Sequence, residues 1–460
     1  MERGGRELDP VRGAADLAAY ARAGFDSFDM ADHYGSAEVI TGTLIATPGR
    51  PALRAFTKWC PAPGPMGPAV VREAVQRALD RLRTPCIDLL QLHWWTFEDP
   101  RYLDALSELA RLREQGLIAQ IGLVNFDTQH LRVVSSEGLP IVSNQVCLSL
   151  LDRRATEQMA ALCLERGVKL LAYGVLGGGF LGERWLGRDE PLEIGDWSKM
   201  KYKRFIDAVG GWQAVQGVLR AAQSIALKHG VSLSNVATRW VLEQPAVAAV
   251  IVGARLGESE HRGDNLRVFD FALDDDDRAL LQAAFDRTLR LGGDCGDEYR
   301  RAPFLTASGD LSHHLETLAP RWQAEPVPAA PGRRRVDSGS PWEPLAGYSR
   351  AYRVGERILV SGTTASHDDG RAVAPDDAAA QATFILDKIV ASVQALGGRA
   401  EDIVRTRVYL SDAADWRGVS AVHAAFFGST RPANTMLQVA GLIGAGHRVE
   451  IEAEAVVDAR

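Results

Sequence analysis

Short runs rich in β-branched and aromatic residues alternate with longer helical runs over the first 290 residues. In the helical runs, such as 69–82 (AVVREAVQRALDRL), 102–114 and 154–166, apolar residues recur at i, i+3 and i+4. Strands that alternate with helices through short loops are typical of a parallel sheet. The expected strands are 25–29, 54–58, 87–93, 118–123, 140–145, 168–173 and 248–253.

Seven such strands predict an α/β fold, a (β/α)8 TIM barrel with seven recognisable strands, rather than an open sheet. A helix over 11–23 leads directly into the first strand, and another helix, 275–287, follows the last one. No strand pattern precedes the first helix. We therefore expect a barrel with one strand unaccounted for.

The pattern changes at 323–340, where QAEPVPAAPGRRRVDSGS is rich in Pro, Gly, Ser and Arg and has no periodicity. Such a composition indicates a linker. Beyond it a new series begins, with strands at 348–354, 357–362, 403–410, 434–439 and 448–457 and helices at 376–396 and 414–427. We expect a barrel domain over 1–322, a linker over 323–340 and a separate α+β domain over 341–460.

Composition and charge narrow the function classes. The 460 residues are 46% hydrophobic and 24% charged, which is enough for large cores. A net charge of −7 without a long basic run argues against nucleic acid and anionic membranes as partners. The five cysteines are odd in number and contain no CxxC pair, which indicates reduced thiols. With no signal-peptide pattern and no long apolar segment, we expect a soluble, cytoplasmic protein.

Four titratable residues lie at or just past the expected strand ends: Asp29, Lys58 and His93, and Tyr34 five residues after Asp29. Taken singly, an Asp there more often caps a helix, and a Lys or His is as often structural. Together they suit carbonyl reduction, because a phenol needs a nearby cation to act as an acid at neutral pH. Lys58 supplies that charge and Asp29 holds the ammonium. Neutral His93 orients the carbonyl by a hydrogen bond.

The segments FDMADHYGSAE, FTKW and LLQLHWW resemble the signature segments of the aldo/keto reductases. The resemblance implies a catalytic tetrad of Asp29, Tyr34, Lys58 and His93, while Asp32 has the wrong spacing to the tyrosine. It also implies that the protein reduces aldehyde or ketone groups of small molecules with NADP(H) as cofactor.

Three further segments resemble the nicotinamide end of the family's cofactor site. GLVNF places Asn125 against the nicotinamide amide, SNQV places Gln145 nearby, and LLAYGVLGGG places Tyr173 against the nicotinamide ring. The turn that follows adds the expected cofactor-binding residues Gly174, Val175, Leu176 and Gly178.

The segment IVGAR, followed by DN, resembles the family's adenosine-phosphate clamp. The resemblance implies that Arg255 binds the 2′-phosphate, which favours NADP(H) over NAD(H), and that Asn265 faces the adenine. His261 stands where a second arginine is frequent in the family.

Other patterns carry less chemistry. Residues 177–182 (GGGFLG) fit G-x-G-x-x-G, but no helix start or acidic residue about 20 positions later follows, so we interpret them as a loop beside the pyrophosphate. Metal catalysis is disfavoured, because the sequence has no HExxH and His313-His314 lies outside any ligand cluster. Trp94 and Trp95 are expected to pack or to line a pocket wall. The stretch 181–211 is expected to cover the pocket mouth.

From about residue 336 the chain resembles the Rid (YjgF-like) family in GYSRAYRVGERILVSGTTA, AAFFGSTRPANTML and VEIEAEAV. The resemblance places Tyr348 and Glu450 at the ligand site and implies a homotrimer. Asn434 stands where the imine hydrolases carry an arginine for the substrate carboxylate. Asparagine cannot make that charge-assisted contact, so a trimerising or ligand-sensing module is favoured over an imine deaminase.

Three hypotheses follow for the whole chain. The leading one is an NADP(H)-dependent carbonyl reductase with a Rid-like accessory domain, favoured by the complete tetrad. The second is an NADP(H)-binding sensor with weak turnover coupled to an oligomerising Rid module. It is favoured because the family's first strand has no counterpart in MERGGRELDP, through a late start site or a natural fragment. The third, an imine deaminase, is disfavoured by Asn434.

Overall fold

The computed structural model describes residues 8–194, 197–254, 256–257, 260–300 and 320–458. By contacts the chain divides into two compact units: residues 1–95, 105–128 and 140–316, and residues 96–104, 129–139 and 317–460. Each unit carries its own sheet.

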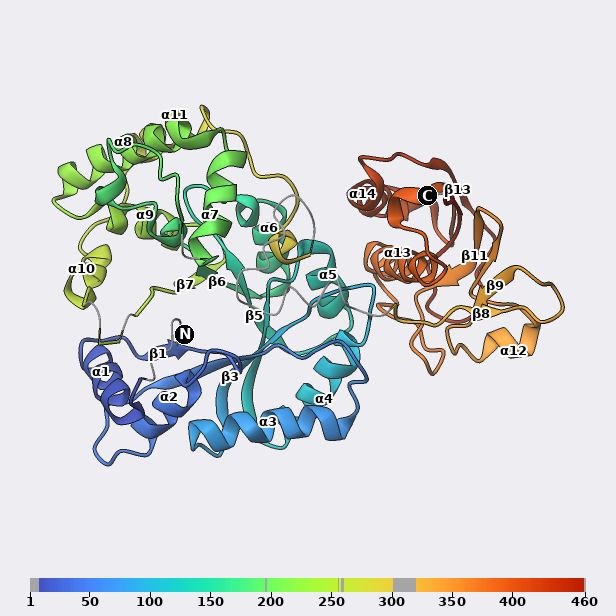
Figure 1. The fold of residues 1–460 in the computed structure, drawn as a ribbon, viewed down its shortest axis with the longest axis horizontal. Coiled ribbons are helices and arrows are strands. Elements are labelled where there is room, and N and C mark those ends of the chain that lie inside the picture. Colours follow the sequence, from blue (N-terminus) through green and yellow to red (C-terminus); the bar gives the residue numbers. More distant parts are fainter. Residues whose placement is uncertain (1–7, 195–196, 255, 258–259, 301–319, 459–460) are drawn as a thin grey trace. The chain divides into compact units, whose positions relative to one another are not determined.

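The first unit is built on seven parallel strands that pair in sequence order (Figure 1). They are β1 (Ser27–Asp29), β2 (Arg54–Trp59), β3 (Ile87–His93), β4 (Ile118–Val124), β5 (Ile141–Cys147), β6 (Lys169–Tyr173) and β7 (Val247–Val250). The sheet is curled, as in a TIM barrel, so the expected fold class is confirmed. Within the described residues, β1 is recorded as pairing with β2 alone and β7 with β6 alone.

Helices alternate with these strands along the chain. In the third helix the buried Val71, Val75, Leu79 and Leu82 recur at helical spacing, with a proline at the first position. The helices are α1 (Pro10–Arg22), α2 (Ala37–Ile45), α3 (Pro68–Leu82), α4 (Tyr102–Glu114), α5 (Thr128–Ser136), α6 (Gln158–Arg166), α7 (Trp197–Ala208), α8 (Gly211–His229), α9 (Leu233–Leu242), α10 (Arg262–Leu266) and α11 (Asp275–Phe285).

The second unit holds a mixed sheet of seven strands in the order β13-β12-β14-β11-β10-β9-β8. β12 and β13 pair in parallel, and the other pairs are antiparallel. The strands are β8 (Glu325–Pro326), β9 (Arg333–Val336), β10 (Ala351–Val354), β11 (Arg357–Thr364), β12 (Ile403–Leu410), β13 (Ala433–Gln438) and β14 (Val449–Val456).

Helix α13 (Ala378–Ala395) packs on β11 and β14 and against α14 (Trp416–Phe427), and a short helix, α12 (Trp342–Ala346), precedes β10. Along β14 the buried Val449, Ile451, Ala453 and Ala455 alternate with partly exposed glutamates. This alternation assigns one face of the sheet to the core and leaves the acidic residues on the other. The result is the α+β architecture expected for the C-terminal part.

Residues 325–326 and 333–336, expected to be linker, form strands β8 and β9. Arg333 to Val336 pair with Val354 to Ala351 of β10, because strand β10 offers an edge to which any extended segment can bond through its backbone. Because this pairing is made through the backbone, it does not require the alternation of apolar and polar side chains that would have predicted a strand from the sequence. In the part of the chain that is described, no helix combines the length and apolar character required to cross a bilayer.

Candidate active site

Asp29 is the centre of a buried polar network at the carboxyl ends of the barrel strands. The Lys58 ammonium forms an ion pair with Asp29 Oδ2 and donates to the Met30 carbonyl at 2.9 Å. Gln91 and Gln145 each donate from Nε2 to Asp29 Oδ1 at 2.9 Å. Because Lys58 and both amides are buried, side chains from β2, β3 and β5 fix the Asp29 carboxylate in place.

Tyr34 lies in the loop after β1, with Lys58 Nζ 5.0 Å from the centre of its ring. The Lys58 charge lowers the pKa of Tyr34, but burial and the nearby Asp29 outweigh it, and the pKa lies above the usual phenol value. Burial lowers the pKa of Lys58, yet Asp29 and Tyr34 raise it more, and the pKa lies above the usual lysine value. The phenol is therefore kept protonated and the ammonium charged.

His93 ends β3 and is 4% exposed. Burial, and next the charge of Arg300, hold the pKa of His93 well below its usual value, so the ring is neutral. A backbone hydrogen bond at Val124 acts in the opposite direction, as a carbonyl acceptor does. Nε2 has no hydrogen-bond partner within the described part of the chain. Nε2 is therefore available to hydrogen-bond a ligand in the site.

Asn125 follows β4 with a φ of +56°, a left-handed conformation that asparagine tolerates. Its N–H donates to the Gln145 carbonyl at 2.8 Å, and its side-chain oxygen accepts from the Tyr173 hydroxyl at 2.9 Å. The two residues expected at the nicotinamide are thus in contact. The Gln145 side chain, by contrast, is bonded to Asp29 and Gln91 and belongs to the carboxylate network.

The turn after β6 carries the expected cofactor residues Gly174, Val175, Leu176 and Gly178. Gly174 and Gly178 have φ values of +70° and +65°, and a Cβ at either position would lie 2.6 Å from an atom of Tyr202. Glycine is the residue that allows this backbone and this contact. Asn265 lies in α10, and Arg255 lies outside the described residues, so the expected 2′-phosphate contact has no structural description.

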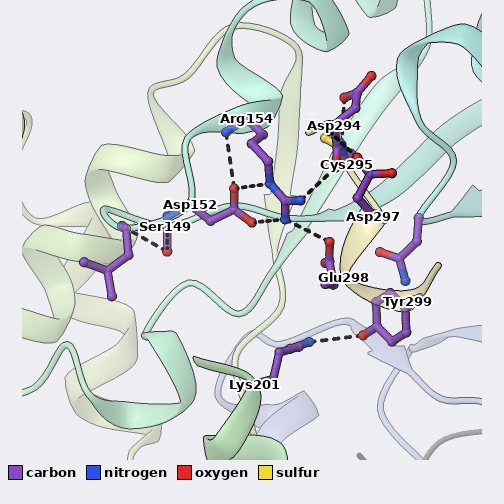
Figure 2. Close-up of polar contacts among 12 residues, drawn as sticks. Ser149, Asp152, Arg154, Lys201, Asp294, Cys295, Asp297, Glu298 and Tyr299 are labelled. Carbon is purple, nitrogen blue, oxygen red and sulfur yellow. Dashed lines mark hydrogen bonds and ion pairs between the residues drawn. The ribbon is translucent and has the colours of Figure 1, made fainter. Parts of the chain in front are cut away.

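A segment that the sequence did not single out, residues 293–300, also lies at this end of the barrel (Figure 2). Arg154 donates to the Asp294 carbonyl at 2.8 Å and to Glu298 Oε2 at 2.8 Å. Arg300 donates to the Asn125 carbonyl at 2.6 Å and to the Trp94 carbonyl. The segment is therefore tied to the loops after β3 and β4 and to the start of η1 (Arg154–Thr156).

Tyr299 and Lys201 bring this segment into contact with the expected site residues. The Tyr299 ring packs with Cys60, Trp95 and Tyr173. Lys201, on α7, is 6% exposed and donates to the Tyr299 hydroxyl at 3.1 Å. Lys201 belongs to the stretch 181–211, which was expected to cover the pocket mouth. Residues 293–300 have no periodicity and no signature in the sequence, so only the fold identifies them.

The second unit does not bring its three expected ligand residues together. Asn434, on β13, donates to Thr406 Oγ1 at 2.9 Å, and that hydroxyl also contacts His423 Nε2 at 2.9 Å. Thr406 is fully buried on the face that packs on the helices. Glu450 alternates with buried residues of β14 and points to the opposite face.

The buried Arg350 contacts Tyr348, and its charge also acts on Glu450. Arg350 Nη2 donates to the Tyr348 hydroxyl at 3.4 Å, and Nη1 donates to Thr363 Oγ1 at 2.6 Å. Burial raises the pKa of Glu450, and the Arg350 charge counteracts only part of this effect. A Cβ at Gly362 would lie 2.1 Å from Glu450 Oε1, so the carboxyl lies directly against that glycine.

The chain belongs to the aldo/keto reductase family, since the profile described as "Aldo/keto reductase family" matches residues 1–286. A second profile, described as "Endoribonuclease L-PSP", matches residues 339–457, so a Rid (YjgF-like) domain follows the barrel. Both resemblances expected from the sequence are confirmed.

Individual relatives match one part or the other. Protein Tas of Escherichia coli is 31% identical over 205 residues, which cover 40% of this chain and 58% of Tas, so the chain spans little more than half of that relative. The glycerol dehydrogenase of Gluconobacter oxydans is 24% identical, covers 61% of this chain and 87% of its own, and has a TM-score of 0.52, which shows the fold alone. A member of the YjgF/YER057c/UK114 family from Mycobacterium tuberculosis is 44% identical and covers 27% of this chain and 100% of its own, with a TM-score of 0.25.

Proposed function

We propose that the barrel reduces aldehyde or ketone groups of small molecules with NADP(H), and that Asp29, Tyr34, Lys58 and His93 are its catalytic residues. The observation that carries this proposal is the buried Lys58 ammonium, paired with Asp29 and 5.0 Å from the Tyr34 ring. A buried charge is costly unless it is compensated, and one placed beside a phenol stabilises the phenolate.

Each residue has a role in moving one proton. When bound, NADPH supplies a hydride to the carbonyl carbon. Tyr34 gives its proton to the carbonyl oxygen, and Lys58 stabilises the phenolate that remains. Asp29 keeps the ammonium charged and in place. His93, which is neutral, forms a hydrogen bond with the substrate carbonyl oxygen through Nε2 and so orients the carbonyl.

The cofactor would be held by residues at or beyond the ends of three strands, β4, β6 and β7. Asn125 and Tyr173, which are in contact, are proposed for the nicotinamide end, and the glycine turn 174–178 for the pyrophosphate. Asn265 and Arg255 are proposed for the adenine and the 2′-phosphate. Gln145 contributes indirectly, by orienting Asp29.

The C-terminal domain, whose sheet includes β8 and β9, is proposed to assemble the chain into a homotrimer. An imine deaminase would need a cation at the carboxylate position. Asn434 provides no charge there, and its amide is bonded to Thr406.

The proposed function is tested by following NADPH oxidation by the full chain with a panel of small aldehydes and ketones. We expect turnover that is lost in Lys58→Met and preserved in Lys169→Met, which removes an exposed lysine at the opposite end of β6. Failure of the wild-type chain to oxidise NADPH with any member of the panel would contradict the proposal.

The cofactor preference is tested at Arg255. Only NADPH presents a 2′-phosphate, so Arg255→Ala should weaken NADPH binding by roughly 10- to 100-fold and leave NADH binding nearly unchanged. Fluorescence titration with both cofactors measures this difference. Equal losses for the two cofactors would place Arg255 elsewhere than at the 2′-phosphate.

A further inference from the structure

The loops after β1 and β2 carry three metal-ligating side chains that the proposed reaction does not use: Asp32, His33 and Cys60. β1 and β2 pair in parallel, so both loops leave the sheet at the same edge. Each side chain offers one ligand atom, and the three atoms lie within 4.8 Å of one another. Cys60 is not part of a disulfide. A carboxylate, an imidazole and a thiolate are the ligand types with which proteins bind zinc.

Asp32 is anchored on both sides by its backbone. Its N–H donates to the Lys58 carbonyl at 3.0 Å, and its own carbonyl accepts from Arg81 Nη1 at 3.0 Å. Its carboxylate accepts from the Cys60 N–H at 3.1 Å and contacts His33 Nδ1 at 2.9 Å. Because this one carboxylate contacts both of the other residues, the three ligands are gathered before an ion binds.

The spacing of the three ligand atoms suits a zinc ion after a small adjustment. In a tetrahedral site, bonds of about 2.0–2.3 Å place the ligand atoms about 3.4–3.6 Å apart. Since the atoms here lie within 4.8 Å of one another, no pair has to close by more than about 1.4 Å. The side chains of Asp32 and His33 are 31% and 22% exposed, so an ion can enter from that side, while Cys60 is buried on the inner side.

Two other clusters of metal-ligating side chains among the described residues already hold a cation of the protein itself: His229–Asp274–Asp277 and Cys147–Asp152–Glu298. Lys228 is paired with both carboxylates of the first cluster, and Arg154 with both carboxylates of the second. For Asp32, the ion pair recorded over the described ranges is with His33 alone. A metal ion would have to displace a lysine or an arginine from the other two clusters, but not from this one.

The cluster lies directly beside the proposed catalytic residues. His33 precedes Tyr34, and the two rings are edge-on with 4.9 Å between their centres. Cys60 comes two residues after Lys58 and packs with Trp95. An ion that draws His33 and Cys60 together restrains the loop that carries Tyr34. A displacement of about 1 Å at a catalytic group can cost about 100-fold in rate, so such an ion would inhibit the reaction.

We propose that Asp32, His33 and Cys60 form a zinc-binding site, and that zinc bound there inhibits the reductase. The ion takes one carboxylate oxygen, one imidazole nitrogen and the thiolate sulfur, and water completes its coordination. The Cys60 thiol gives its proton to the solvent as the zinc–sulfur bond forms, and no electron is transferred. The inhibition rests on the proposed carbonyl reductase function, whereas the binding of zinc does not.

The site is tested with Co²⁺ as a spectroscopic probe for zinc, added to the reduced full chain after treatment with a chelator. A bond between Co²⁺ and a thiolate gives a charge-transfer absorption in the near ultraviolet, which carboxylate and imidazole ligands alone do not give. We expect this band to appear with Co²⁺ and to be lost when Zn²⁺ is added.

Two variants remove one ligand each, and each has a matched control. Cys60→Ser should abolish the band, whereas Cys86→Ser, at a partly exposed cysteine just before β3, should keep it. His33→Gln should weaken the binding of Zn²⁺ by at least 10- to 100-fold, whereas His229→Gln should leave it unchanged. Melting temperatures in the presence of the chelator show whether each variant is folded.

Inhibition is measured as the rate of NADPH oxidation with Zn²⁺ relative to the rate with a chelator, separately for each protein. Zn²⁺ should inhibit the wild-type chain over the same concentrations at which it displaces Co²⁺, and the chelator should restore the rate. Cys60→Ser should need at least about tenfold more Zn²⁺ for the same relative inhibition. Mg²⁺ should not inhibit, because it prefers oxygen ligands.

The outcomes separate the site from the inhibition and from the proposed function. A wild-type chain without the cobalt–thiolate band, or a band that persists in Cys60→Ser, overturns the site. If the band behaves as expected and Zn²⁺ does not inhibit, the inhibitory role is overturned and the site stands. If the wild-type chain oxidises NADPH with no carbonyl compound, the proposed function fails, and the cobalt spectra still decide whether the site exists.

Discussion

The barrel brings its expected site residues together, whereas the Rid domain places two of its expected ligand residues on opposite faces of its sheet. In the barrel, Asp29 and Lys58 come from neighbouring parallel strands and meet at the same end of the sheet. In the Rid domain, Asn434 and Glu450 come from strands on either side of β12, and their side chains are on opposite faces. A parallel barrel collects strand-end residues by its topology, whereas a mixed sheet sorts residues by their parity along the strand.

The buried charges of the two regions are arranged alike. In the barrel the buried Lys58 ammonium is paired with Asp29 and lies beside the Tyr34 ring. In the Rid domain the buried Arg350 is paired with Glu343 and donates to the Tyr348 hydroxyl and to Thr363. We infer from the uncharged Asn434, and not from the burial of a cation, that the barrel is the catalytic region and that the Rid domain serves binding or assembly.

The largest effect is expected at the barrel phenol. Tyr34→Phe removes the proton donor, so carbonyl reduction should fall by roughly 100- to 10,000-fold. NADPH binding should stay within a few-fold of wild type, because the phenol lies away from the adenosine end. Steady-state kinetics and fluorescence titration measure the two quantities. A clean Tyr34→Phe protein with substantial activity would remove the basis for the contrast between the two regions.

A smaller effect is expected from displacing the segment that carries Tyr299. Gly296→Ala places a Cβ 2.1 Å from the Asn125 carbonyl oxygen at a φ of +82°, so residues 293–300 must shift. We expect kcat/KM to fall by roughly tenfold and the melting temperature to drop by a few degrees.

Gly292→Ala is the matched control, because a Cβ there meets no atom within 4 Å. Its activity and melting temperature should equal those of wild type. If both variants behave alike, the position of residues 293–300 does not matter for the barrel site.

The sequence predicted the strands of the barrel well, because buried parallel strands are short apolar runs with polar residues at their ends. Ile87–His93 and Tyr102–Glu114 have the predicted bounds, and Asp29, Lys58 and His93 lie at the expected strand ends. The spacing of these residues within the signature segments then indicated the catalytic set. Local sequence is sufficient where the end of a strand determines the position of a side chain.

Sequence reasoning was insufficient where the site depends on contacts between distant segments. Tyr299 and Lys201 are 98 residues apart and carry no recognisable pattern. Trp95 was expected to pack or to line a wall, and the sequence did not show that its buried Nε1 has no hydrogen-bond partner among the described residues. For Asn434, the sequence showed the missing charge, but its bond to Thr406 follows from the pairing of β12 with β13.

The next prediction concerns Asn434. We expect no measurable hydrolysis of imines of 2-keto acids by the full chain, because Asn434 carries no charge to bind the substrate carboxylate. Asn434→Ala should lower the melting temperature of the Rid domain slightly, by the loss of a hydrogen bond worth about 1 kcal/mol. Asn434→Ser, which can still bond to Thr406, should lower it less. Efficient imine turnover by the wild type would end the contrast between a catalytic and a non-catalytic region.

The smallest expected effect is a difference in the pH dependence of stability. Burial holds the pKa of His93 below its usual value and the pKa of Glu450 above its usual value. For His93 the unfolded chain binds the extra proton, so its contribution is present above about pH 6.5 and is lost as the pH falls toward the folded pKa. For Glu450 the folded chain binds the extra proton, so its contribution is present below about pH 4.3 and is lost as the pH rises through the folded pKa.

The two variants His93→Gln and Glu450→Gln should therefore act with opposite signs. We compare the melting temperature at about pH 7.5 with that at about pH 5.5, a window that lies around the unfolded pKa of histidine. His93→Gln should make the barrel relatively more stable at the lower pH. The melting temperature at about pH 7.5 should then exceed that at about pH 5.5 by a smaller margin than in wild type, with a change of at most a few degrees. Glu450→Gln should increase this margin, because ionisation of the buried wild-type carboxyl at the higher pH costs stability and the amide does not ionise. Shifts of the same sign in both variants would mean that burial does not control these two groups in the way that the two folds indicate.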